Sequence, residues 1–179
     1  MHAYTGDCNE ILPRDVFPLV EYNQYRRALC LLDPYNIDLA WEVVALAGKM
    51  RSMEIFLNFM VMDMNMNVLL RDSSKVDLKQ IARMNRFWGD ESWREVIYER
   101  RTNLFDWDMD EKVGTNEVLV EAYRQRLINV AGFKCVPQPV PMRNQIGKTI
   151  YYLFFASPNE TGKKIVEDIF EKYRRVGER

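Results

Sequence analysis

The sequence predicts an α/β protein with a mostly parallel sheet, an antiparallel strand pair near the carboxyl end and a helical insertion. Two near-continuous apolar runs, at 28–32 and 53–60, are typical of strands that helices cover on both faces. An amphipathic segment separates these runs, as in a parallel crossover unit. Two later strands, at 133–142 and 148–157, are joined by a hairpin-length loop that contains a glycine, which predicts antiparallel pairing.

Length and composition fit a single domain, residues 1–179. The chain is 47% hydrophobic and 28% charged, with a formal net charge of -1, so it has no basic field typical of nucleic-acid binding. Three separated cysteines and one histidine show no metal-ligand spacing, which predicts no metal site and reduced thiols. No apolar stretch is long enough to span a bilayer, so we expect a cytoplasmic protein with no membrane partner.

The amino-terminal elements are expected in the order strand, helix, strand, helix. His2 to Thr5 fits a short strand, and Gly6 to Glu10 turns it into a helix from about Ile11 to Tyr22. The buried strand at 29–32 follows, and then a helix from about Leu39 to Lys49 with apolar residues at core-facing intervals.

The middle of the chain, about 72–114, is expected to be a helical insertion. Just before it, methionines occupy every second position from Met60 to Met66, and gap-filling core is a more common use of methionine than an adaptable contact surface. Within it, Trp88 and Trp93 flank a glycine in FWGDESW, and we expect at least one of them to be core rather than partner surface. Residues 103–114 lack the glycine and terminal glutamate of a calcium loop and fit a solvated acidic loop.

The carboxyl-terminal elements are a helix, the strand pair and a second helix. Residues 115–132 form an amphipathic helix, with Gly132 at the position of a left-handed terminus. Three alternating prolines at 137, 139 and 141 place the first strand of the pair at a sheet edge. The last helix, about 160–175, is expected to pack Ile165, Ile169 and Phe170.

The candidate site is the polar tetrapeptide Asp33-Pro34-Tyr35-Asn36, which follows the first apolar run directly. Side chains at the carboxyl end of a buried parallel strand enter the crevice where α/β proteins bind ligands. The alternative interpretation is structural, because Asp and Asn also cap helices and Pro shapes turns. These residues alone leave both interpretations open.

The order of elements resembles the second part of the S-adenosylmethionine-dependent methyltransferase fold, a Rossmann-like, mostly parallel sheet with one reversed strand. Gly6-Asp7, followed by Cys8, resembles the position at which such enzymes hold the adenine of the cofactor. Asp33-Pro34-Tyr35 resembles the DPPY motif of amino-methyltransferases, with one proline in place of two.

The chain also resembles the three-Cys-motif partner protein family over nearly its whole length. The segments that carry this resemblance are GDCNEIL, LLDPYNIDLAWEVV, RFWGDESWREV, AYRQRLINVAGF and PVPMRNQIGKTIYYLFFAS. The family's amino-terminal glycine-rich turn and the acidic end of its next strand have no counterpart here, so the resemblance implies a domain truncated at the amino terminus that carries strands three to seven.

The resemblance implies a methyltransferase-like function. Asp33 and the carbonyl of Pro34 would accept hydrogen bonds from an exocyclic amine, Tyr35 would stack on the base, and a nucleic-acid base would have to be unpaired or flipped. Without the glycine-rich turn, the chain alone should bind S-adenosylmethionine poorly. The alternative function is an inactive partner module for a three-cysteine radical-enzyme-like protein.

The missing strands also leave the edge of the strand at 29–32 to be covered. Either His2 to Thr5 moves directly beside it, or another chain supplies the neighbour, through self-association or a separate amino-terminal fragment. Direct pairing is favoured, because the intervening helix is long enough for a right-handed crossover.

Overall fold

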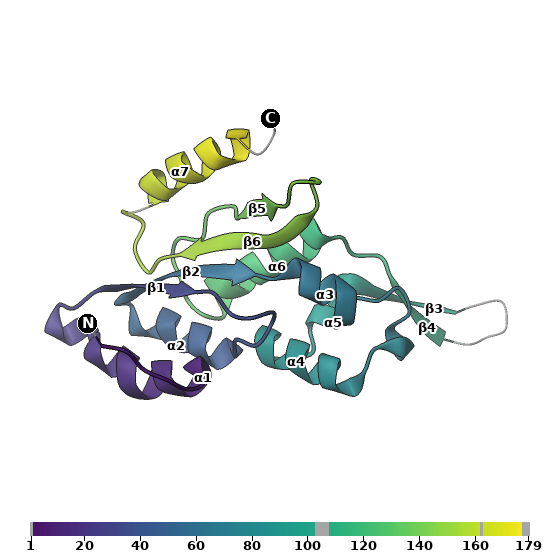
Figure 1. Ribbon diagram of the computed structural model, residues 1–179, viewed down its shortest axis with the longest axis horizontal. Helices are drawn as coiled ribbons and strands as arrows, with labels where there is room; N and C mark the ends of the chain where they lie inside the picture. Colours follow the sequence, from purple (N-terminus) through teal and green to yellow (C-terminus); the bar gives the residue numbers. More distant parts are fainter. Residues whose placement is uncertain (1, 103–107, 162, 177–179) are drawn as a thin grey trace.

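The computed structural model describes residues 2–102, 108–161 and 163–176 and shows a mixed α/β fold (Figure 1). The main sheet has the order β1-β2-β6-β5, and its strands are β1 (Ala28–Leu32), β2 (Met53–Phe59), β5 (Val140–Arg143) and β6 (Thr149–Ala156). β1 and β2 are parallel, and β6 is antiparallel to both β2 and β5. β6 is therefore the one reversed strand of this sheet.

Helices cover the two faces of the sheet unequally. The longer helices are α2 (Trp41–Met50), α4 (Leu78–Trp88), α6 (Asn116–Asn129) and α7 (Lys163–Val176). The shorter elements are α1 (Cys8–Ile11), α3 (Val61–Asn67), α5 (Trp93–Ile97), the π-helix Leu12–Val16 and the 3-10 turns Phe17–Leu19, Tyr22–Gln24 and Ser73–Lys75. α2, α4 and α6 pack on one face of the sheet and form the main core with it. α7 lies beside β5 and covers part of the other face of the sheet (Figure 1).

β2 supplies both cores because successive side chains of a strand point to opposite faces. Ile55, Leu57 and Phe59 are fully buried on the α2 face. Phe56 points the other way and contacts Phe170 of α7, with the ring centroids 6.2 Å apart. This alternation fixes which face each helix can cover.

The amino-terminal segment departs from the expected strand and helix. Residues 2–5 form no strand, and the helix expected at 11–22 is helical only as far as Leu19, as α1 continued by a π-helix (Leu12–Val16) and a 3-10 turn (Phe17–Leu19). Pro18 lies inside the expected helix, where its ring removes a backbone donor and clashes with the preceding turn. Direct pairing of residues 2–5 with 29–32 is therefore wrong, and in the described part of the chain β2 is the one strand beside β1.

The segment around 61–112 combines helices with a strand pair that the pattern did not predict. The methionine run lies on α3, where Met64 is buried and Met66 is 60% exposed. The prediction that these methionines fill the core is therefore right for Met64 and wrong for Met66. β3 (Tyr98–Thr102) and β4 (Asp108–Lys112) pair antiparallel. The expected acidic loop at 103–114 thus contains β4, and residues 103–107 lie outside the described residues.

Trp88 and Trp93 are both core residues, each 1% exposed. The indole Nε1 of Trp88 donates to Ser92 Oγ at 2.9 Å, and that of Trp93 donates to Asn85 Oδ1 at 2.8 Å. Gly89 separates the two elements with φ 102°, and a Cβ there would lie 2.4 Å from Cδ1 of Trp41. Glycine is required at this position for both reasons.

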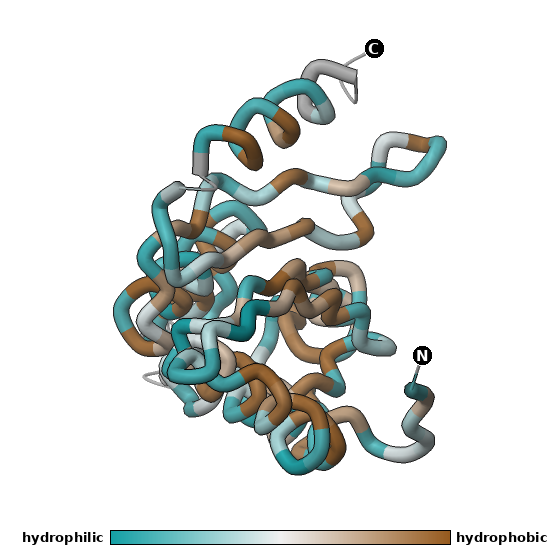
Figure 2. The backbone as a smooth tube through the Cα atoms, turned by 90° about the vertical axis from the view of Figure 1, so that its left-hand side faces the viewer, coloured by the Kyte–Doolittle hydropathy of each residue, from teal (hydrophilic) through white to brown (hydrophobic). Residues whose placement is uncertain are grey.

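The carboxyl-terminal elements agree with the pattern in order. Gly132 follows α6 with φ 85°. β5 lies at a sheet edge as expected, but it begins at Val140, so of the three prolines of the strand expected at 133–142 only Pro141 belongs to it. Apolar positions recur along α7 between polar ones (Figure 2). Val166 and Phe170 are its buried residues, whereas Ile165 and Ile169 are 65% and 47% exposed, so their expected packing is wrong.

In the described ranges, no helix combines the length and apolar character needed to cross a membrane.

Tyr123 of α6 lies at the centre of an aromatic cluster in the main core. Its ring stacks on Phe87 at 5.4 Å and meets Trp41, Phe59 and Phe154 at 4.8 to 5.7 Å. Its hydroxyl is buried and has no hydrogen-bond partner among the residues that the structure describes. Burial raises the pKa of this hydroxyl far above its usual range. The hydroxyl is therefore a destabilising feature of an otherwise apolar cluster.

We predict that Tyr123→Phe stabilises the protein by about 1 kcal/mol, because the substitution removes a desolvated group that bonds to nothing. Tyr152→Phe is the matched control. The hydroxyl of Tyr152 bonds to Glu117 Oε1 at 3.1 Å, so its removal should destabilise by about 1 kcal/mol. Urea denaturation measures both, and equal destabilisation by the two substitutions would contradict the unpaired state of the Tyr123 hydroxyl.

Candidate functional site

Asp33 to Asn36 lie where the sequence predicted, at the carboxyl end of β1. Asn58 occupies the matching end of β2, and its Nδ2 donates to Asp33 Oδ1 at 2.5 Å. Pro34 and Asn36 are half-buried, and the Tyr35 side chain is 84% exposed. Asn36 has φ 56°, a left-handed conformation that asparagine tolerates better than most residues.

Gly6, Asp7 and Cys8 form the entry to α1. Gly6 has φ 144°, and Asp7 caps the helix by accepting the Asn9 N–H at 2.8 Å. This backbone hydrogen bond holds the pKa of Asp7 below its usual range. The residue Cys8 as a whole is exposed, but its thiol is partly desolvated. This desolvation raises the pKa of the thiol, and the negative charge of Asp7 raises it further. Cys8 is therefore a neutral thiol rather than an activated thiolate.

Asn9 connects this segment to the loop after β1. Its Nδ2 donates to the carbonyl of Asp38 at 2.9 Å, and its Oδ1 accepts the Ala40 N–H at 2.6 Å. Asn9 thus ties the entry of α1 to the loop after β1. The contact is made at residues 38–40, at the far end of the loop from Asp33.

A buried carboxylate, that of Asp63, also binds the loop after β1. Asp63 of α3 accepts the Ile37 N–H at 3.2 Å, the Nδ2 of Asn67 at 2.6 Å and the Nη2 of Arg83 at 3.0 Å. Arg83 of α4 also donates through Nε to Asp38 Oδ1 at 3.1 Å. The loop is therefore held by two helices and by Asn9.

Sequence reasoning missed the supporting residues Asn9, Asn58, Asp63 and Arg83. Asn9 lies in the turn predicted at 6–10 and Asn58 within the strand predicted at 53–60, and neither was assigned a role. Asp63 lies within the methionine run, where sequence reasoning assigned a role to the methionines only. Nothing local indicates Arg83, whose partners lie 20 and 45 positions away.

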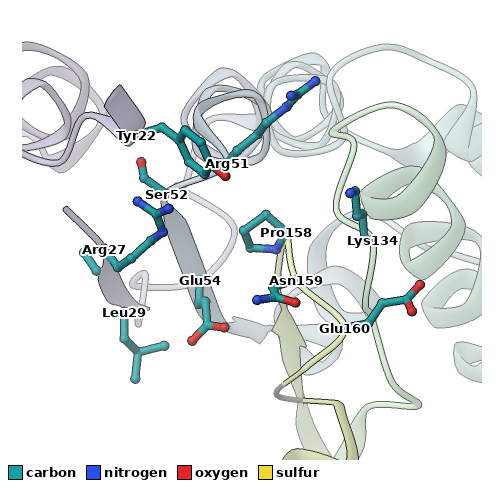
Figure 3. A pocket seen from close by; sticks show the side chains of 11 residues that line it. Tyr22, Arg27, Leu29, Arg51, Ser52, Glu54, Lys134, Pro158, Asn159 and Glu160 are labelled. Carbon is teal, nitrogen blue, oxygen red and sulfur yellow. The ribbon is translucent and has the colours of Figure 1, made fainter. Parts of the chain in front are cut away.

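A pocket of about 910 Å³ lies at the opposite end of β1 and β2 (Figure 3). It is lined by Tyr22, Arg27, Ala28, Leu29, Arg51, Ser52, Glu54, Lys134, Pro158, Asn159 and Glu160. Its Glu54 already accepts the Ser157 hydroxyl at 2.7 Å, and the Arg51 side chain points away from Glu54 (Figure 3). The lining mixes both charges, so it selects no ligand class. It is separate from the Asp33 loop.

Comparisons with protein-family models, with curated proteins and with solved structures find no match to this chain. Within residues 2–102, 108–161 and 163–176, no group of three or more His, Cys, Asp or Glu side chains is placed to hold a metal ion.

We predict that Asp63→Ala destabilises the protein by about 3 kcal/mol, because it leaves the Ile37 N–H and part of the Arg83 guanidinium without their buried acceptor. Asp38→Ala is the matched control, since it removes the other carboxylate that bonds Arg83. The Asp38 side chain is 54% exposed, whereas that of Asp63 is 5% exposed. The loss of the Asp38 carboxylate should therefore cost less than about 1 kcal/mol. Denaturant titration measures both, and a similar cost for the two would show that burial of Asp63 does not matter.

Proposed function

We propose that this chain is the carboxy-terminal part of an S-adenosylmethionine-dependent methyltransferase-like protein, in which the Asp33 loop binds an exocyclic amine, with nucleobase amines as the favoured class. The observation that carries the proposal is the strand order. β5 is antiparallel to β6, and β6 is antiparallel to β2, so β5 runs in the same direction as β1 and β2. Three strands of one direction with a single reversed strand fit the carboxyl half of a sheet of this type.

The geometry of Asp33 supports amine binding. Asn58 orients the carboxylate by donating to Oδ1. In the described structure no other side chain of the loop bonds Asp33, so Oδ2 can accept an N–H from a ligand. The carbonyl of Pro34 is the second acceptor, and the exposed ring of Tyr35 can stack on a base. Two acceptors and one stacking face would orient the nitrogen lone pair, so the chain contributes mainly by positioning.

The residues for the cofactor fit less well. The Asp7 carboxylate is already used by Asn9 in capping α1, and Gly6 and Cys8 are exposed. S-adenosylmethionine would supply the methyl group, and we propose that residues outside this chain hold most of it. The roles assigned to this chain are therefore limited to binding and orienting the amine.

Adenosine and inosine test the amine site directly, because inosine carries a carbonyl where adenosine carries the exocyclic amine. We expect adenosine to shift the Asn58 side-chain amide and Tyr35 ring resonances at millimolar concentrations, and inosine to shift them several-fold less. Asp33→Ala should abolish the difference, and Asp33→Asn should retain part of it, because the amide oxygen still accepts a hydrogen bond. Equal responses to the two nucleosides would overturn the proposal.

Calorimetry with S-adenosylmethionine tests the assignment of the cofactor. We expect this chain alone to bind it at least 100-fold more weakly than the micromolar affinity usual for enzyme ligands, that is, with a dissociation constant of about 0.1 mM or more. Tight binding that Asp7→Ala removes would show instead that Gly6 to Cys8 are a complete cofactor site.

The alternative, an inactive partner module, assigned protein contact to the helical insertion. Trp88 and Trp93, the large aromatic residues named for that role, are buried and bonded internally. A partner surface in this region would have to use other residues, and no specific contact favours it.

A further inference from the structure

The two edges of the main sheet are protected very differently. β5 contains Pro141, and α7 packs beside it. β1 has the sequence ALCLL, with no proline and no charge, and in the described ranges no strand lies on its outer side. Natural proteins usually protect an edge of this kind with charge, proline or a covering element.

β1 also exposes the groups that strand pairing needs. The N–H of Ala28 donates to the carbonyl of Ser52 at 3.0 Å, so Ala28 directs its backbone groups toward β2. Because alternate residues of a strand direct these groups to opposite sides, those of Leu29 and Leu31 point outward. The side chains of Leu29 and Leu31 are 53% and 72% exposed and share one face of the strand.

We propose that β1 is the interface through which two copies of this chain associate, by antiparallel pairing of β1 with β1 of the second copy about a twofold axis at Cys30. In this register Leu29 lies opposite Leu31 of the second copy, and the two residues exchange backbone hydrogen bonds. The sheets of the two copies then form one continuous sheet. The interface is self-complementary, as a twofold dimer requires.

The charges beside β1 select this register. Arg27 precedes the strand and Asp33 follows it, and both are exposed. Pairing centred on Cys30 places Arg27 opposite Asp33 of the second copy, twice per dimer. A register shifted by two residues would lose both of these opposite-charge pairs, because the twofold axis relates them, and a parallel pairing in register would put like charges together. A second copy therefore complements this edge in hydrogen bonding, apolar surface and charge.

The first test is the mass of the protein measured by sedimentation over a concentration series. We expect the wild type to reach twice its 21.3 kDa monomer mass. Leu31→Lys should raise the dissociation constant by roughly 100-fold, because each dimer loses two buried leucines. Leu78→Lys is the matched control, since Leu78 is 81% exposed but lies at the start of α4, and it should leave the mass unchanged. A wild type that stays monomeric, or a dimer that Leu31→Lys does not weaken, would overturn the proposal.

A charge exchange tests the register. Arg27→Asp and Asp33→Arg should each weaken association about tenfold or more, because each places like charges opposite one another. The double variant R27D/D33R restores opposite charges and should recover the dimer. If the double variant is no better than the single variants, the register is wrong.

Oxidation of Cys30 gives a third test, which does not depend on comparing dissociation constants. In this register the two Cys30 residues form a pair without direct hydrogen bonds, with Cα atoms about 4.5 Å apart, which a disulfide can span. Diamide oxidation of a Cys8→Ser variant should give a covalent dimer that Cys30→Ser abolishes. Absence of that product from a dimeric sample would place the interface elsewhere. Leu31→Lys retains Asp33, so its response to adenosine tests the amine site independently of association.

Discussion

The buried carboxylate of Asp63 is the interaction on which the candidate site depends. A charge removed from water is costly unless hydrogen bonds and an opposite charge satisfy it. Here the Ile37 N–H, the Asn67 amide and the Arg83 guanidinium do so together. Because these donors come from the loop after β1, from α3 and from α4, the carboxylate fixes three segments at once.

The loop after β1 has a buried end that is bonded to the rest of the fold and an exposed end that faces solvent. Its buried end, at residues 37–40, is bonded to Asp63 and Asn9. Its exposed end keeps the Asp33 carboxylate and the Tyr35 ring available to a ligand. Asp33 also borders the open edge of β1, so one carboxylate serves both the proposed amine site and the proposed pairing of two copies. Association would therefore compete with amine binding.

The sequence predicted those parts of the fold that depend on local pattern. β1 and β2 are short apolar runs, and α6 is a helix that buries Leu119, Val120, Tyr123 and Leu127 and is followed by Gly132 in the left-handed region. The proline-bearing strand lies at an edge because proline lacks a donor. The position of Asp33 to Asn36 at a strand end followed from β1 itself.

The remaining features depend on contacts between residues far apart in the chain. Residues 2–5 do not pair with the open edge of β1, whereas β3 and β4 pair with one another although neither is apolar. The support from Asn9, Asp63 and Arg83 spans 20 to 45 positions. Local periodicity carries no information on such pairs.

The central claim is that the loop after β1 is held in place before any ligand binds. Hydrogen exchange of the Ile37 and Ala40 amides in the free protein tests it most directly, because these amides donate to Asp63 and Asn9. Bonds of this kind predict exchange that is slowed to the level of the β2 amides in the core. Exchange of either amide at the rate of an unfolded peptide, while β2 stays protected, would contradict the claim.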